Sequence, residues 1–93
     1  ESWIGPLQVL WTPGHSPGCM VAYEATHGRA IVGDLVFAQG IGRTDFPRSD
    51  PRAMVNSLER IFRDLPSETV IYPGHGPWEV TLGSAEQYAR MFL

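Results

Sequence analysis

The sequence contains a single cysteine, Cys19, and no lysine. One cysteine excludes an intrachain disulfide and is typical of a protein from a reducing compartment, so we expect a cytoplasmic location. The seven basic residues are all arginines and are scattered along the chain, so no basic patch predicts a nucleic-acid partner. No apolar run approaches the length of a membrane-spanning helix, so we expect no membrane partner either.

The remaining composition is that of an ordinary globular protein. Hydrophobic residues make up 43% of the 93 positions and charged residues 18%, with a net charge of −3. A chain of this length forms one domain, residues 1–93, and buries only about 60–65% of the surface that its unfolded chain exposes. Stability of the isolated chain is therefore expected to be modest.

Two loops rich in proline and glycine each hold one histidine. Residues 12–18, Thr-Pro-Gly-His-Ser-Pro-Gly, surround His15, and residues 72–77, Tyr-Pro-Gly-His-Gly-Pro, surround His75. Such stretches cannot be helical and make poor central strands, so each predicts a stiff loop with a fixed imidazole. An apolar run at 30–33 ends in a carboxylate, Asp34. The predicted strands beside these residues are 7–12, 19–26, 30–33 and 69–72.

The rest of the chain supplies a hairpin, a long loop and two helices. The turn at 26–29 predicts a hairpin over 19–33. Residues 35–50 lack a period and read as a long functional loop anchored by Phe37, Ile41 and Phe46. The clearest helix is 51–65, with Asp50 as N-cap and one apolar face. That face comprises Met54, Val55, Leu58, Ile61, Phe62 and Leu65.

Two finer predictions concern helix ends and helix surfaces. Ser84 and Gln87 form a capping box that predicts a last helix at 85–93, with Ala85, Tyr88, Ala89 and Phe92 facing inward. Glu59 and Arg63, four residues apart on the outer side of the first helix, predict a small favourable ion pair.

His15, Asp34 and His75 each follow a predicted strand, and strand ends in one sheet lie side by side. Two imidazoles and a carboxylate suit zinc, with iron or manganese as alternatives. A shared metal site is therefore one interpretation. Three unrelated turn residues that merely end strands are the other, and the residues by themselves leave both open.

Four ordered motifs stand out along the chain: Thr12-Pro13-Gly14-His15-Ser16-Pro17-Gly18, Val32-Gly33-Asp34, Gly42-Arg43-Thr44-Asp45-Phe46-Pro47 and Tyr72-Pro73-Gly74-His75-Gly76-Pro77. They closely resemble the motifs of the metallo-β-lactamase superfamily, and within it those of the glyoxalase II-like hydrolases. The Thr81-Leu82-Gly83 segment followed by Glu86 also resembles that branch.

The resemblance implies metal-ligand roles for three residues. His15 would be a ligand of a first metal, Asp34 would bridge two metals, and His75 would be a ligand of the second, with zinc as the expected cofactor. By the same resemblance, Thr12, Arg43 and Asp45 would support the ligands or order the surrounding loops.

One part of the family pattern is missing, because no His-x-His-x-Asp-His motif occurs in the chain. The sequence therefore resembles only the C-terminal half of an αββα sandwich. We expect an α/β (α+β layered) fold with a mostly antiparallel sheet and two helices on one face. We expect thioester or ester hydrolysis of a small molecule only when the missing half is supplied, and no activity from this chain alone.

A stand-alone, non-catalytic half-domain is the alternative. Strand residues on both alternations are apolar, for example Val9 and Trp11 against Leu10, so one sheet face would lack a cover. Such a face predicts a homodimer. We interpret Cys19 as a small buried residue and His27 as a solvated turn residue rather than as ligands. For the three tryptophans, Trp3, Trp11 and Trp78, packing in the core or an interface is favoured over lining a pocket.

Overall fold

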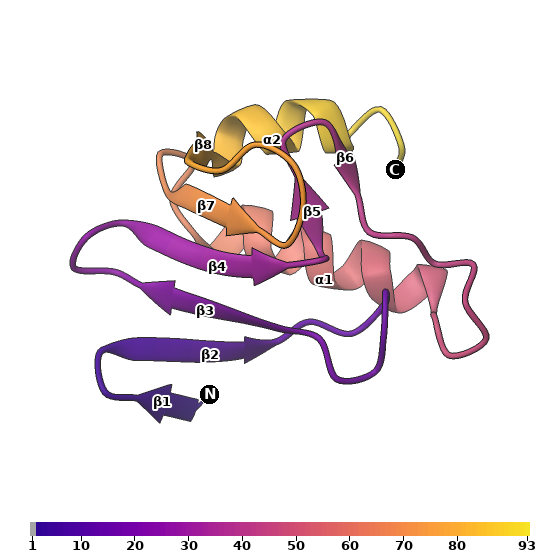
Figure 1. Ribbon diagram of the computed structural model, residues 1–93, viewed down its shortest axis with the longest axis horizontal. Coiled ribbons are helices and arrows are strands. Elements are labelled where there is room, and N and C mark those ends of the chain that lie inside the picture. The colour runs from indigo at the N-terminus through magenta and orange to yellow at the C-terminus, as the bar shows by residue number, and fades with distance from the viewer. Residues whose placement is uncertain (1) are drawn as a thin grey trace.

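The computed structural model describes residues 2–93 and shows a six-stranded mixed sheet with two helices (Figure 1). The strand order is β1-β2-β3-β4-β7-β8, and β5 and β6 form a separate hairpin. The elements are β1 (Ser2–Ile4), β2 (Leu7–Trp11), β3 (Met20–Glu24), β4 (Arg29–Gly33), β5 (Val36–Phe37), β6 (Gly40–Ile41), α1 (Pro51–Asp64), β7 (Val70–Pro73), β8 (Val80–Thr81) and α2 (Leu82–Ala89).

Neighbouring strands of the large sheet are antiparallel except for β4 and β7. In the parallel pair Ala30 lies opposite Ile71. A parallel pair needs a long crossover connection, which residues 34–69 provide with the β5–β6 hairpin and α1. The expected class, a mostly antiparallel sheet with helices in an α/β arrangement, is confirmed.

The core lies between the sheet and the two helices. Helix α1 begins where predicted, because the Asp50 side chain accepts hydrogen bonds from the backbone N–H groups of Arg52 and Ala53. Every second strand residue points to the helices, and the buried apolar side chains form one cluster. Its members are Leu10, Val21, Ala30, Val32, Leu35, Val36, Met54, Leu58, Ile61, Leu65, Ile71, Leu82, Ala85 and Ala89.

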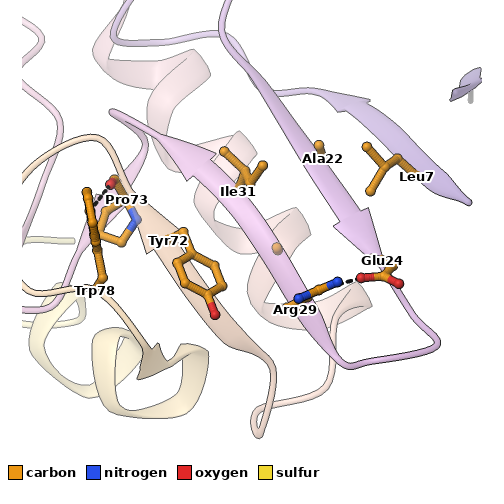
Figure 2. A pocket seen from close by; sticks show the side chains of 9 residues that line it. Leu7, Ala22, Glu24, Arg29, Ile31, Tyr72, Pro73 and Trp78 are labelled. Atoms are coloured by element: carbon orange, nitrogen blue, oxygen red, sulfur yellow. Dashed lines mark hydrogen bonds and ion pairs between the residues drawn. The ribbon is translucent and has the colours of Figure 1, made fainter.

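The other face of the sheet is open, although its side chains are also largely apolar. Figure 2 shows Ala22, Ile31 and Tyr72 in front of the sheet, with α1 behind it. Ile31 is 59% exposed, so the wholly apolar run at 30–33 is covered on one face only. We call this surface the open face; its residues include Leu7, Val9, Trp11, Met20, Ala22, Glu24, Arg29, Ile31, Tyr72 and Trp78.

Several short elements were not predicted. Ser2–Ile4 is not among the predicted strands, yet it pairs with β2. The loop at 35–50 contains the two-residue strands β5 and β6, and Val80–Thr81 pairs with β7 as β8. These strands are too short to show a hydrophobic period of their own, and it is their pairing partners that define them.

The last helix begins at Leu82, three residues before the predicted start. Thr81, not Ser84, is its N-cap, and the Thr81 side chain accepts a hydrogen bond from the Ser84 N–H. Ala85 and Ala89 point inward as expected, whereas Tyr88 and Phe92 are exposed, so their predicted inward placement was wrong. The helix ends at Ala89, and residues 90–93 form a turn and an irregular end, so the predicted extension to residue 93 was wrong.

Two details of α1 also differ from the prediction. Val55 is 39% exposed and lies outside the buried stripe. Glu59 pairs with Arg90 beyond the end of α2, at 2.7 Å, while Arg63 pairs with Asp64. In place of the predicted Glu59–Arg63 pair, each of the two side chains thus contacts a different partner. Within residues 2–93, neither helix has the length and apolarity needed to cross a membrane.

Candidate metal centre

His15 is presented by a loop that is fixed at its base and tip. The Thr12 N–H donates to the Cys19 carbonyl (2.8 Å), which closes the base of the loop. The Ser49 hydroxyl donates to the His15 carbonyl at 2.7 Å, and the Ser57 hydroxyl donates to the Pro13 carbonyl at 2.7 Å. These bonds tie the loop to the start of α1 and hold the imidazole in one place.

Gly14, next to His15, is required by both conformation and space. Its φ is +148°, a region that side chains rarely allow, and a Cβ there would overlap the backbone of Met54. The loop can therefore lie directly against the first turn of α1 only because this position is glycine.

Asp34 and His75 follow the two parallel strands β4 and β7, which places them at one edge of the sheet. The Gly74 N–H donates to the Gly33 carbonyl at 2.7 Å, so the pairing of the strands continues into the two loops. A Cβ on Gly74 would lie only 2.6 Å from Asp34 Oδ1. Glycine at this position leaves room for the Asp34 carboxylate beside the second loop.

The three side chains meet at this carboxylate. His15 Nε2 lies 3.5 Å from Asp34 Oδ2, and His75 Nδ1 lies 3.0 Å from Asp34 Oδ1. The His15 side chain is 20% exposed, that of Asp34 34%, and that of His75 76%. The structure therefore brings together the three residues singled out from the sequence, and their role as metal ligands stays a prediction.

The donor set is suitable for a divalent cation but incomplete. Asp34 Oδ1 is buried and accepts no hydrogen bond of good geometry, although His75 Nδ1 lies 3.0 Å away, so its hydrogen-bonding capacity is not satisfied by the chain. Over residues 2–93, no three His, Cys, Asp or Glu side chains are gathered as a ready metal-binding group. The imidazoles contact opposite oxygens of one carboxylate instead, and a bound cation would replace these direct contacts.

Arg43 and Thr12 contact the His15 loop through backbone groups, Asp45 contacts Arg43 through its side chain, and their supporting role stays a prediction. The Arg43 carbonyl lies 2.8 Å from His15 Nδ1, which therefore carries the proton and leaves Nε2 directed to Asp34. The Arg43 guanidinium binds both carboxylate oxygens of Asp45, and this hydrogen bonding lowers the pKa of Asp45. The Thr12 hydroxyl is buried without a hydrogen-bond partner, and the residue acts through its N–H.

Sequence reasoning missed the contacts that the long loop makes with the histidines. The Phe46 ring packs edge to face on His15, and the Phe37 ring does the same on His75. Both phenylalanines had been expected only to anchor the loop. Two aromatic residues in a loop between two histidine-bearing motifs were the available signal, but nothing in the sequence paired each ring with its histidine.

The remaining residues considered from the sequence lie away from this site or stay undecided. Cys19 is partly buried, with its Sγ 3.0 Å from the Ser16 hydroxyl. His27 is largely exposed in its turn, as expected, and contacts Glu24. Trp3, Trp11 and Trp78 are all more than 60% exposed, which excludes packing in the core of this chain, and an interface role stays a prediction. Trp78 lines a pocket on the open face, the alternative that was not favoured (Figure 2).

Comparison with known proteins fits this geometry. The family model described as the metallo-beta-lactamase superfamily matches residues 4–75. The chain belongs to this superfamily. Hydroxyacylglutathione hydrolase GloC of Haemophilus influenzae is 37% identical over 87 residues, which cover 94% of this chain and 40% of GloC. Human mitochondrial persulfide dioxygenase ETHE1 is 32% identical over 87% of this chain and 32% of its own length.

A solved structure extends the similarity to three dimensions. The protein TTHA1623 in a di-iron-bound form superposes with a TM-score of 0.90 and 41% identity, over 99% of this chain and 45% of that one. Members of the superfamily thus bind metal ions. TTHA1623 in this structure holds iron, whereas zinc was the metal expected for our chain. This chain spans less than half the length of each of these three proteins.

Proposed function

We propose that this chain is the metal-binding C-terminal half of a glyoxalase II-like hydrolase that acts on thioesters or related esters. The observation that carries the proposal is the Asp34 carboxylate between His15 and His75, with its buried Oδ1 lacking a hydrogen bond. Similarity to GloC favours a hydrolase, whereas similarity to ETHE1 shows that one fold serves another reaction.

The roles of the chain's own residues follow from their surroundings. A bound divalent cation would polarise a carbonyl and lower the pKa of a bound water. His15 Nε2 and His75 would donate lone pairs, and Asp34 would supply negative charge between them. The Arg43 carbonyl keeps the proton of His15 on Nδ1, and Gly74 leaves room for the Asp34 carboxylate beside the second loop.

Three donors are fewer than a catalytic site needs for two metals. We therefore expect zinc to bind with modest affinity and the isolated chain to hydrolyse thioesters very poorly. A turnover on the order of 10 per second with added zinc, a typical enzyme value, would contradict this expectation. Iron and manganese are tested in the same assay, because imidazole and carboxylate ligands suit them too.

Zinc titration by calorimetry tests the site. The wild type should bind one equivalent, His15→Ala and Asp34→Asn should lose most of the affinity, and His27→Ala should bind as the wild type does. His27 is a matched control because it is also an imidazole beside a carboxylate, in the β3–β4 turn. Equal heats from wild type and His15→Ala would overturn the proposal.

A second candidate function, a stand-alone interaction unit that forms a homodimer, is favoured by the open face. Its charged groups Glu24 and Arg29 lie side by side in an ion pair within an otherwise mostly apolar surface. A two-fold dimer brings the same patch of both chains together, and because Glu24 and Arg29 are paired within each chain, this patch would carry little net charge to repel a second copy.

Light scattering coupled to size exclusion at about 50 μM measures the association. The dimer has twice the 10.3 kDa mass of one chain, and Ile31→Lys at the centre of the open face should return it to the monomer. Arg52→Glu, on the exposed start of α1, is the control and should leave the mass unchanged. A monodisperse wild-type monomer would exclude the homodimer.

A further inference from the structure

One loop contacts both imidazoles of the candidate metal centre. The ring centroids of Phe46 and His15 are 5.4 Å apart with the planes at 83°, and those of Phe37 and His75 are 5.8 Å apart at 78°. Both are edge-to-face arrangements, in which the electron-poor edge of one ring meets the electron-rich face of the other. Each histidine thus has its own phenylalanine, and both phenylalanines come from residues 35–50.

This loop is fixed close to Asp34. The β5–β6 hairpin brings the Gly42 N–H to the Leu35 carbonyl at 3.1 Å. At Gly42 a Cβ would overlap the Asp34 carbonyl, so the chain passes directly over the residue that both histidines contact. Phe37 precedes this crossing in the sequence and Phe46 follows it, and each contacts a different imidazole.

The Phe46 ring, which is partly exposed, also contacts the Arg43 side chain. The Arg43 guanidinium lies 4.6 Å from the centre of the Phe46 ring, in a cation–π contact. The same guanidinium is fixed by two hydrogen bonds to Asp45, of 3.0 and 2.9 Å. Asp45, Arg43, Phe46 and His15 therefore form a chain of contacts that ends on the imidazole.

We infer that Phe37 and Phe46 are positioning residues that fix the imidazole planes of His75 and His15 beside Asp34, an inference that rests on the proposed metal-binding function. An imidazole turns about two side-chain torsions, and a metal accepts its lone pair only in the ring plane. Packing that limits this rotation therefore favours binding.

The two positions are unequal. His15 is 20% exposed and has the Arg43 carbonyl as an additional hydrogen-bond partner. His75 is 76% exposed and is held by its contacts with Asp34 and Phe37. Loss of the ring should therefore matter more at position 37 than at position 46.

Two measurements on the 93-residue chain test this inference. The first is the set of imidazole carbon–proton signals of the metal-free protein, observed by NMR. The second is zinc affinity by calorimetry. The variants are Phe37→Leu, Phe46→Leu and the conservative Phe37→Tyr. Phe92→Leu is the control, because the Phe92 ring lies against Tyr88 at the C-terminal end and not against a histidine.

We expect Phe37→Leu to shift the signals of His75 and not those of His15, and Phe46→Leu to do the reverse. Zinc affinity should fall roughly 2- to 12-fold for Phe37→Leu, the value of an edge-to-face pair, and less for Phe46→Leu. Phe37→Tyr should restore the wild-type affinity, and Phe92→Leu should leave both measurements unchanged.

Unchanged His75 signals in Phe37→Leu, or equal zinc affinity in all variants, would overturn the inference. If the wild type itself binds no zinc, the proposed function fails on its own, and the imidazole signals alone decide whether the phenylalanines orient the rings. A thermal unfolding curve for each variant separates these effects from loss of the fold.

Discussion

The two faces of the six-stranded sheet are made by the same strands, yet they lie in different surroundings. In β4, Val32 is 1% exposed under the helices, while its neighbour Ile31 is 59% exposed on the open face. In β3, Val21 is fully buried and Met20 is 57% exposed. A strand with solvent on one side normally alternates with polar residues, so this pattern indicates that both faces are suited to burial. In this chain the helices cover only one of them.

The covered face should carry most of the stability, and Leu58 on α1 is its most sensitive point. This side chain is fully buried in the cluster between helix and sheet. Leu58→Ala should lower the free energy of unfolding by roughly 2–5 kcal/mol, measured by urea denaturation. Val55→Ala, on the same helix but exposed, is the control and should cost far less. A loss below about 0.5 kcal/mol for Leu58→Ala would mean that the helix does not pack as described.

A sharper comparison uses adjacent residues of β4. Val32→Thr keeps the shape of the side chain but buries a hydroxyl, and we expect a loss of about 1–3 kcal/mol. Ile31→Thr introduces the same residue one position away on the open face and should change stability by about 0.5 kcal/mol or less in dilute solution. Equal losses at the two positions would show that the open face is covered in solution.

The sequence pattern predicted the longer strands and the first helix, but it missed the short strands and the start of the last helix. The strand Leu7–Trp11 was identified as a largely apolar run that ends at a Pro-Gly loop, and the helix Pro51–Asp64 by the period of its apolar residues. Strands of two or three residues were missed, since only their partners define them. The choice of Thr81 over Ser84 as N-cap could not be made locally either, because both side chains cap helices well and the packing of Leu82 and Ala85 decides between them.

The candidate site was predictable in its members and not in its geometry. The strand ends made a shared site of His15, Asp34 and His75 one of two open interpretations, and the family resemblance favoured it. The structure brings the three residues together, and their role as ligands stays a prediction. The orientation of each imidazole depends on the Arg43 carbonyl and on two phenylalanine rings. A backbone carbonyl has no residue type, so no sequence pattern marks it, and the ring contacts depend on how a long loop folds.

The smallest expected effect concerns the ion pair of the open face. The hydrogen bond from Arg29, with a further one involving His27, lowers the pKa of Glu24 below its ordinary value. A lowered pKa in the folded state contributes stability above the ordinary pKa, near 4.5, and this contribution is lost as the pH falls through the folded-state value.

Glu24→Gln should therefore flatten the decline of stability below about pH 4.5, measured as urea midpoints at several pH values. The variant Glu68→Gln, at an exposed turn, serves as the control and should follow the wild-type curve. A Glu24→Gln curve that coincides with the wild type throughout would show that the ion pair is not formed in solution.

The parallel pairing of β4 with β7 has a consequence for the order in which the molecule assembles. The β3–β4 hairpin closes over a short turn, but β7 reaches β4 only after residues 34–69 have crossed over. Contacts between residues far apart in sequence form late and set the folding rate. Asp34 and His75 follow the two strands of this pairing, so we expect them to come together late in folding. If the proposed site holds a cation, that cation would bind the folded chain in preference to partly folded chains and would stabilise the completed β4–β7 pairing.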